Sequence, residues 1–185
     1  QKRKGSDYHA EVPLKLVLEE EYYDLILEGR ADGIQILTEG EKPDYSVSFQ
    51  NIVLEDSAKV IIDEIKGIYM KLDHLLAPVG VHLAQAKCYA YIYALQHELK
   101  RIGVQMTYVN LDTEEMKYFS EEYTFEALEG WFDDLIASYR KWSDFQYAWK
   151  KLRQESIQKL QFPFAYRKGQ KELAAGVYRT IQRKK

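Results

Sequence analysis

The chain has 185 residues, enough for one domain with a substantial hydrophobic core and too few for two complete domains. Its hydrophobic fraction of 46% and charged fraction of 30% are those of an ordinary globular protein, and its net charge of -3 excludes an overall basic character. Lysine and arginine nevertheless cluster at 1–4, at 140–153 and from Arg167 onward, as either a local nucleic-acid-binding surface or solvated faces.

The cysteine and apolar content limit the chemistry of the chain. Cys88 is the single cysteine, so the chain alone cannot form an internal disulfide or a four-cysteine zinc or iron–sulfur site. No apolar run approaches the length of a membrane span, and the N-terminal QKRKGSDY is not followed by the apolar stretch of a signal peptide. We therefore expect a cytoplasmic protein with no membrane partner.

Alternating apolar residues predict strands in the N-terminal part of the chain. Strands are expected at 8–18, 22–29, 30–37 and, more weakly, 47–55. Pro13 indicates an edge strand or a bulge, and Gly29 is expected to break the second strand from the third. The polar segment 38–46 has the composition of a turn.

The next predicted strand, KVIIDEIKG at 59–67, begins apolar and ends in charged residues. Because side chains alternate along a strand, Glu64 and Lys66 should point to one face, and Asp63 and Ile65 to the other. A Glu-x-Lys pair on a strand is usually a surface ion pair of little energetic value. Here it interrupts an apolar run, where charges are costly unless they serve a purpose.

Helical periodicity begins after this strand. A helix is predicted over 81–103, with Gly103 as its cap and an apolar face formed by Ala84, Cys88, Tyr91, Leu95, Leu99 and Ile102. A strand is predicted at 104–111 and a long helix at about 124–160, whose aromatic stripe should be core: Trp142, Phe145, Trp149 and Leu152. An amphipathic helix should start near Lys168. This order predicts an α/β domain with a mixed sheet.

Charged residues from two strands are expected to converge. Asp32 on a neighbouring strand would join Glu64 and Lys66, although an Asp next to glycines is more often a turn residue. Mg²⁺ takes oxygen ligands, usually one or two carboxylates, and leaves positions for a substrate phosphate. A nearby lysine can orient the attacking water or stabilise charge on that phosphate. Gln85 and Tyr89 share a helix face, which alone would indicate only a half-exposed surface.

Three motifs occur in a recognisable order: G-x-x-D-G at 29–33, apolar-x-E-x-K at 62–66 and H-x-x-Q-x-x-x-Y at 82–89. Together they resemble the RecB-like branch of the PD-(D/E)XK nucleases, over roughly residues 8–111. The resemblance implies a restriction-endonuclease-like α/β fold within 1–160. In that fold a mixed central sheet is flanked by helices, and a C-terminal helical extension follows.

The same resemblance implies an active site. By position in the motifs, Asp32 and Glu64 would ligate a catalytic Mg²⁺ or Mn²⁺ ion, and the main-chain carbonyl of Ile65 would complete the protein ligands. Lys66 would be catalytic. Asp63 would lie outside the site. Side chains alternate along a strand, so Asp63 points to the other face from Glu64 and Lys66, and Asp32 already matches the leading Asp of the family.

The helix motif adds two residues to the implied site, and the sequence departs from the family at one place. Gln85 and Tyr89 would help to place the substrate strand. Many relatives carry a metal-binding His on a helix before the first strand, whereas only QKRKGSDY precedes that strand here; either this His lies upstream of Gln1 or the site works without it. His9 and His82 do not occupy the expected place.

A second resemblance concerns the C-terminal segment FPFAYRKGQKELAAGVYRTI at 162–181. It resembles the segment just upstream of the nucleotide-binding loop in superfamily 2 DNA-repair helicases, in which Arg167 and Gln170 would contact the nucleotide once the motor is attached. No G-x-x-x-x-G-K-[ST] motif occurs, so the chain as given cannot be an ATPase. The resemblance implies that 161–185 is a linker and the start of a truncated, covalently attached helicase motor.

These resemblances imply a metal-dependent deoxyribonuclease, an exonuclease acting on single-stranded DNA ends or flaps supplied by the helicase. One alternative is a catalytically weak or inactive DNA-binding accessory domain of a helicase. RNA stays open as a substrate, because phosphate chemistry alone does not identify the sugar.

Overall fold

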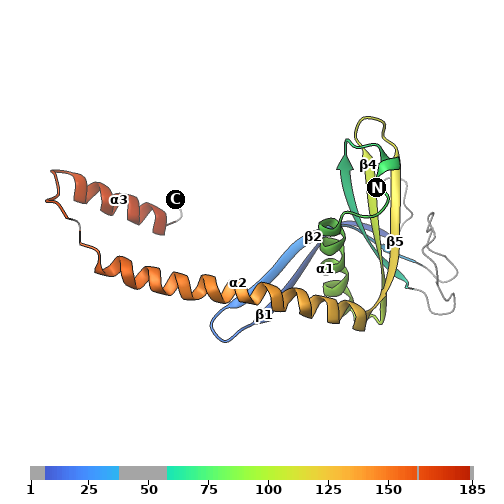
Figure 1. Ribbon diagram of the computed structural model, residues 1–185, viewed down its shortest axis with the longest axis horizontal. Coiled ribbons are helices and arrows are strands. Elements are labelled where there is room, and N and C mark those ends of the chain that lie inside the picture. Colours follow the sequence, from blue (N-terminus) through green and yellow to red (C-terminus); the bar gives the residue numbers. More distant parts are fainter. Residues whose placement is uncertain (1–6, 38–57, 162, 184–185) are drawn as a thin grey trace. The chain divides into compact units, whose positions relative to one another are not determined.

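A computed structural model describes residues 7–37, 58–161 and 163–183 (Figure 1). Within these residues, five strands form one sheet in the order β1-β2-β3-β4-β5. The strands are β1 (Tyr8–Glu19), β2 (Asp24–Ile36), β3 (Val60–Ile68), β4 (Arg101–Asn110) and β5 (Met116–Thr124). β3 and β4 are parallel, and the other neighbouring pairs are antiparallel. The predicted α/β class with a mixed sheet is confirmed.

The described residues also form helices. They are α1 (Gly80–Gln96), α2 (Phe125–Lys159) and α3 (Gln170–Gln182), with a short 3₁₀ turn at Leu72–His74. α1 connects β3 to β4, because a parallel strand pair needs a crossover connection (Figure 1). None of the helices that the structure describes is both long and apolar enough to cross a membrane.

The core lies between the sheet, α1 and the first turns of α2. α1 buries mainly small residues, including Ala86 and Ala90, which allow its backbone to approach the sheet closely. Tyr91 of α1 stacks on Phe132 of α2 with 4.1 Å between ring centroids. The predicted apolar face was therefore right at Tyr91 and wrong at Leu95, which is exposed.

The prediction that Gly29 breaks a strand is wrong. β2 runs without interruption from Asp24 to Ile36, and Gly29 pairs with Leu14 in the middle of the β1–β2 ladder. The long antiparallel pairing with β1 keeps the backbone extended through the glycine. A glycine inside a strand often marks a place where another group approaches the backbone closely.

The prediction that α1 continues to Gly103 is also wrong. The helix ends at Gln96, and Glu98 takes the left-handed conformation, with φ of 53°, that usually ends a helix at a glycine. Gly103 lies in β4, where it pairs with Ile61 of β3. The apolar residues of the helix are followed closely by the apolar residues of the buried strand β4, so the sequence pattern does not show where α1 ends.

The edge strand β5 was not predicted. Two adjacent residues of this strand, Phe119 and Ser120, are both buried, so the strand lacks the alternation that identifies a half-buried strand. Its position follows from pairing with β4 over nine positions, which is tertiary information. The predicted turn at 38–46 and the predicted weak strand at 47–55 lie outside the described residues.

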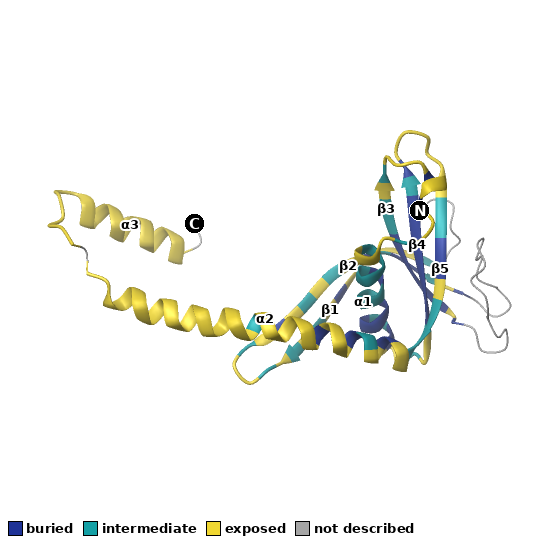
Figure 2. Ribbon diagram, viewed as in Figure 1, coloured by how far each residue is buried: buried dark blue, intermediate teal, exposed yellow. Residues whose placement is uncertain are grey.

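The chain divides into two compact units, Gln1–Ala137 and Ser138–Lys185. The division falls inside α2, whereas the predicted domains meet between residues 160 and 161. In the first unit, α2 buries Leu128, Phe132 and Ile136. In the second unit, α2 and α3 are exposed almost throughout (Figure 2).

The aromatic stripe of α2 is therefore not part of the core. Trp142 is 55% exposed, and the remaining members of the stripe, Phe145, Trp149 and Leu152, are exposed to a similar extent. The helical spacing of the stripe was recognised correctly, but the expectation that it is buried was wrong. Periodicity shows which side chains share a face, and burial requires a partner for that face.

Candidate functional site

The candidate site forms where β2 and β3 separate. Their pairing runs from Ile36–Val60 to Gly33–Asp63 and stops there. The next β2 residue toward the N-terminus is Asp32, whose carboxylate Oδ2 accepts a hydrogen bond from the backbone N–H of Ile65 at 2.8 Å. The Asp32 side chain thus replaces a missing strand partner and is held beside the charged end of β3.

Glu64 and Lys66 form an ion pair on one face of β3, as the alternation predicts. Lys66 Nζ lies 2.6 Å from Glu64 Oε1. Glu64 is almost completely buried, whereas the Lys66 side chain is 24% exposed. The lysine therefore connects a buried carboxylate to solvent.

The helix residues Gln85 and Tyr89 extend this pair into a chain of hydrogen bonds. Lys66 Nζ donates to Gln85 Oε1 at 3.2 Å, and Gln85 Nε2 donates to the Tyr89 hydroxyl at 3.2 Å. The structure thus brings β3 and α1 together through three of the predicted site residues. The interpretation of Gln85 and Tyr89 as only a half-exposed helix surface does not account for these contacts.

Tyr108 anchors the first turn of α1, and the motifs gave no sign of it. Tyr108 is next to Lys66 in the β3–β4 register and is fully buried. Its hydroxyl accepts the backbone N–H of Val79 at 2.9 Å and lies 3.2 Å from His82 Nδ1. His82 of the third motif therefore helps to fix the helix that carries Gln85.

Each glycine of the G-x-x-D-G motif makes room for a tyrosine. A Cβ atom on Gly29 would lie 2.5 Å from the Tyr89 hydroxyl, and one on Gly33 would lie 1.7 Å from the Tyr8 hydroxyl. Real Cβ atoms do not approach other atoms so closely. The motif thus flanks Asp32 with two positions at which a tyrosine ring crosses the backbone.

Asp63 belongs to a separate, internally satisfied network. Its carboxylate accepts hydrogen bonds from Tyr8 (3.0 Å), Gln105 (3.0 Å) and Thr107 (2.6 Å). Burial and the adjacent Asp63 carboxylate raise the pKa of Tyr8, which keeps this phenol protonated as a donor. Asp63 therefore binds residues other than the Glu64–Lys66 pair, as expected from the alternation of side chains along β3.

Glu64 is an unusual carboxylate. Its second oxygen, Oε2, is buried and has no hydrogen-bond partner among the described residues. Burial raises the pKa of Glu64, and the charges of Asp32 and Asp63 raise it further, against the opposing effect of Lys66. An ionised Glu64 consequently lacks part of the stabilisation that a buried charge requires.

The donor set fits a hard divalent cation of the Mg²⁺ type. In the parts of the chain that the structure describes, no group of three or more His, Cys, Asp or Glu side chains could hold a metal ion. Mg²⁺ needs fewer, because it is commonly held by one or two carboxylates, with water and substrate phosphate at the other positions. The unpartnered oxygen of Glu64, the Asp32 carboxylate and the carbonyl of Ile65 are oxygen donors of the kind that such an ion takes.

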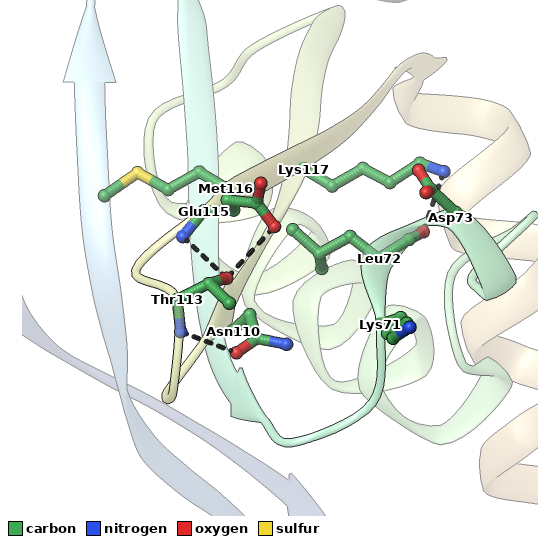
Figure 3. Close-up of a pocket in the computed structure, with 8 residues that line it drawn as sticks. All are labelled: Lys71, Leu72, Asp73, Asn110, Thr113, Glu115, Met116 and Lys117. Atoms are coloured by element: carbon green, nitrogen blue, oxygen red, sulfur yellow. Dashed lines mark hydrogen bonds between the residues drawn. The ribbon is translucent and has the colours of Figure 1, made fainter.

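A cavity of about 520 Å³ lies at another place, between the segment after β3 and the β4–β5 turn (Figure 3). Its polar groups hold the turn together: Asn110 Oδ1 accepts the backbone N–H of Thr113, and Lys117 Nζ donates to the carbonyl of Leu72 (Figure 3). None of the predicted site residues lines it. Its size alone does not make it the functional site, because several of its polar lining groups already form hydrogen bonds with one another.

The predicted nucleotide contacts Arg167 and Gln170 lie at the start of α3. Gln170 Oε1 accepts the backbone N–H of Arg167 at 2.8 Å, and Gly169 has the positive φ of 84° that the turn requires. Both residues are exposed. The two residues are thus brought into one turn.

No protein-family model and no curated protein matches the chain. Among solved structures, the chain is similar to the crystal structure of SSO0001, with a TM-score of 0.39 and 18% sequence identity. The similarity covers 72% of this chain and 52% of that one, so this chain spans about half the length of the structure it matches. A similarity of this level carries no argument about function.

Proposed function

We propose that the chain is a divalent-metal-dependent deoxyribonuclease, an exonuclease that is attached to a DNA-repair-type helicase in the cytoplasm. The observation that carries the proposal is the buried oxygen Oε2 of Glu64, which has no hydrogen-bond partner among the described residues. Burying a carboxylate oxygen without a hydrogen-bond partner costs free energy, and a bound cation would offset that cost. The nearby Asp32 carboxylate and the resemblance of the three motifs to RecB-like nucleases support the same conclusion.

Each residue of the site has a role in this proposal. Asp32 and Glu64, with the carbonyl of Ile65, would hold Mg²⁺ or Mn²⁺, which when bound supplies Lewis acidity at the scissile phosphate. Lys66 contributes a fixed positive charge where negative charge develops during hydrolysis. Its hydrogen bond to Gln85 fixes the direction of the ammonium group. Tyr89 orients Gln85 in turn.

A second candidate function is a catalytically weak or inactive DNA-binding accessory domain. The observation that favours it is that the described residues contain no group of three or more metal-ligating side chains. In this case the Glu64–Lys66 pair would be a buried structural ion pair, which stabilises a fold little. The two functions differ in whether the wild-type chain cleaves DNA.

The test is cleavage of end-labelled single-stranded and duplex DNA by the purified chain, with Mn²⁺, Mg²⁺ or EDTA. We expect metal-dependent cleavage by the wild type. Asp32→Ala and Lys66→Ala should each reduce its rate by at least about 100-fold, because the first removes a metal ligand and the second removes the positive charge at the scissile phosphate. An RNA substrate of the same sequence measures the choice of sugar.

Matched controls are Asp73→Ala and Lys59→Ala, because both side chains are exposed and lie outside the site. They should cleave at the wild-type rate, and circular dichroism should show that all variants are folded. Unchanged activity in either site variant would refute the assignment. If the wild type binds DNA but does not cleave it with either metal, the accessory function is supported instead.

A further inference from the structure

The charge of the chain is divided sharply between its two compact units. Residues 138–185, here called the basic arm, contain 13 lysines and arginines against three acidic residues, a net charge of +10. Residues 1–137 contain 13 lysines and arginines against 26 acidic residues, a net charge of -13. The overall charge of -3 therefore conceals a strongly basic segment.

The basic arm also carries exposed aromatic side chains. All described residues of the arm except Ser143 are exposed (Figure 2). With 100° per residue, Trp142, Phe145, Trp149 and Leu152 fall within an arc of roughly 80° on α2. The stripe is therefore one continuous apolar face, and no described residue of the arm buries it.

The aromatic rings are arranged in pairs along this face. Phe145 and Trp149 lie nearly parallel, with 9° between the ring planes and 6.5 Å between centroids. Trp142 is paired with Tyr139, with 5.6 Å between centroids. Neighbouring rings thus limit the motion of one another, which lowers the entropy that would be lost when a flat ligand stacks on them.

Basic side chains lie on both sides of the stripe. At 100° per residue, Lys141 and Lys159 fall about 100° to one side of Trp142, and Lys150 falls about 80° to the other. Arg153 falls just outside the arc of the stripe, about 20° from Trp142 on the same side as Lys150. Exposed aromatic rings with basic side chains on both sides can bind a ligand that has flat rings and a repeating negative charge.

We propose that the basic arm binds single-stranded DNA, through base stacking on the stripe and phosphate contacts to the flanking lysines and arginines. Unpaired bases expose flat faces that stack on aromatic side chains, whereas the bases of a duplex are covered by their neighbours. Phosphates supply the negative charge that a net charge of +10 attracts. This binding is independent of the proposed nuclease site, because it needs neither metal nor Lys66.

The test uses fluorescence anisotropy of a labelled oligothymidine of about 20 nucleotides, longer than the ~4–16 nucleotides that a single-strand-binding domain occupies. Binding to the intact chain is measured in EDTA, with a duplex of equal length as comparison. We expect the single strand to bind more tightly. Trp142→Ala/Trp149→Ala should weaken that binding by at least about tenfold and affect the duplex much less.

A charge variant tests the phosphate contacts separately. Lys141→Gln/Lys150→Gln/Arg153→Gln should reduce the slope of log affinity against log salt by about 2, since each single-strand phosphate contact contributes about 0.7. The matched control removes three exposed lysines from the first unit, Lys15→Gln/Lys59→Gln/Lys71→Gln. This control, and Tyr69→Ala as an exposed aromatic control, should bind the oligonucleotide as the wild type does.

Three results would overturn the proposal. The first is wild-type affinity of Trp142→Ala/Trp149→Ala for the single strand, and the second is an equal loss for single strand and duplex. The third is that this variant changes only the oligomeric state in sedimentation, which would identify the stripe as a contact between copies of the chain. Lys66→Ala should retain full binding, so failure of the proposed nuclease would leave this result unaffected.

Discussion

Glu64 is the residue on which the stability of the site and its proposed metal chemistry both depend. Its pKa lies above the 4.5 of an exposed glutamate, so the folded state favours the neutral form. The stability that this form provides is fully present below about pH 4.5 and is lost as the pH rises through the raised pKa. At neutral pH an ionised Glu64 therefore opposes folding, despite its ion pair with Lys66, unless a further cation such as a metal ion binds it.

Glu64→Gln should remove this dependence, because the amide has a similar shape and no charge. In EDTA, the melting temperature of the variant minus that of the wild type should increase from about pH 5 to about pH 8. Mn²⁺ should raise the melting temperature of the wild type and not that of the variant. Differential scanning fluorimetry measures both effects.

The exposed loop residue Glu21 supplies the control for this measurement. Glu21→Gln should follow the wild type in both pH and metal response. A melting-temperature difference between Glu64→Gln and wild type that is the same at both pH values would contradict the raised pKa. An equal metal response of the two proteins would show that the cation binds elsewhere.

Gly33 is a second residue with a specific consequence, because the Tyr8 ring crosses its backbone. Gly33→Ala should lower the free energy of unfolding by about 1–3 kcal/mol through steric overlap. In a Tyr8→Ala background the same substitution should cost much less, since the ring that it meets is absent. Urea unfolding of the four proteins measures this coupling, and an equal cost in both backgrounds would exclude it.

At the level of secondary-structure elements, α2 is one helix with two different environments. Phe132 is buried against Tyr91, so Phe132→Ala should lower the free energy of unfolding by about 3–5 kcal/mol. Trp142 is exposed, so Trp142→Ala should change it by no more than about 0.5 kcal/mol. Chemical denaturation distinguishes the two. A large cost at Trp142 would mean that the stripe packs against another part of the protein.

The elements that the sequence predicted best are those with one clear periodicity. β3 was predicted together with the direction of its charged side chains, because alternation in an extended strand is enforced by backbone geometry. β5 and the end of α1 were not, because two adjacent buried residues and a left-handed Glu98 leave no local signal. Pairing with β4 determines the position of β5, and pairing partners are not visible in a local pattern.

The candidate site was predictable to a similar degree. The motifs identified Asp32, Glu64 and Lys66 as neighbours, and the structure shows the contacts of each with β3 or within it. Tyr108 was missed, since a tyrosine within a predicted strand carries no sign that its hydroxyl holds the start of a helix. A sequence motif identifies the residues that a family shares at its site. A residue such as Tyr108, which only positions a helix, is recognised from its contacts in the structure.

At the level of the whole molecule, two units of opposite charge share one continuous helix. The first unit has the sheet, the buried core and the candidate site, and its net charge is -13. The second has a net charge of +10 and is exposed almost throughout. An acidic first unit repels the backbone of DNA, so the proposed attraction of DNA to this chain would come mainly from the basic arm.

The same segregation of charge governs how copies of the chain behave in concentrated solution. At low ionic strength the arm of one molecule is attracted to the acidic unit of another, and such contacts can repeat from copy to copy. Salt at about 0.1 M limits this attraction to a range of about 10 Å. The protein should therefore dissolve better as moderate salt is added, a salting-in behaviour that its modest overall charge conceals.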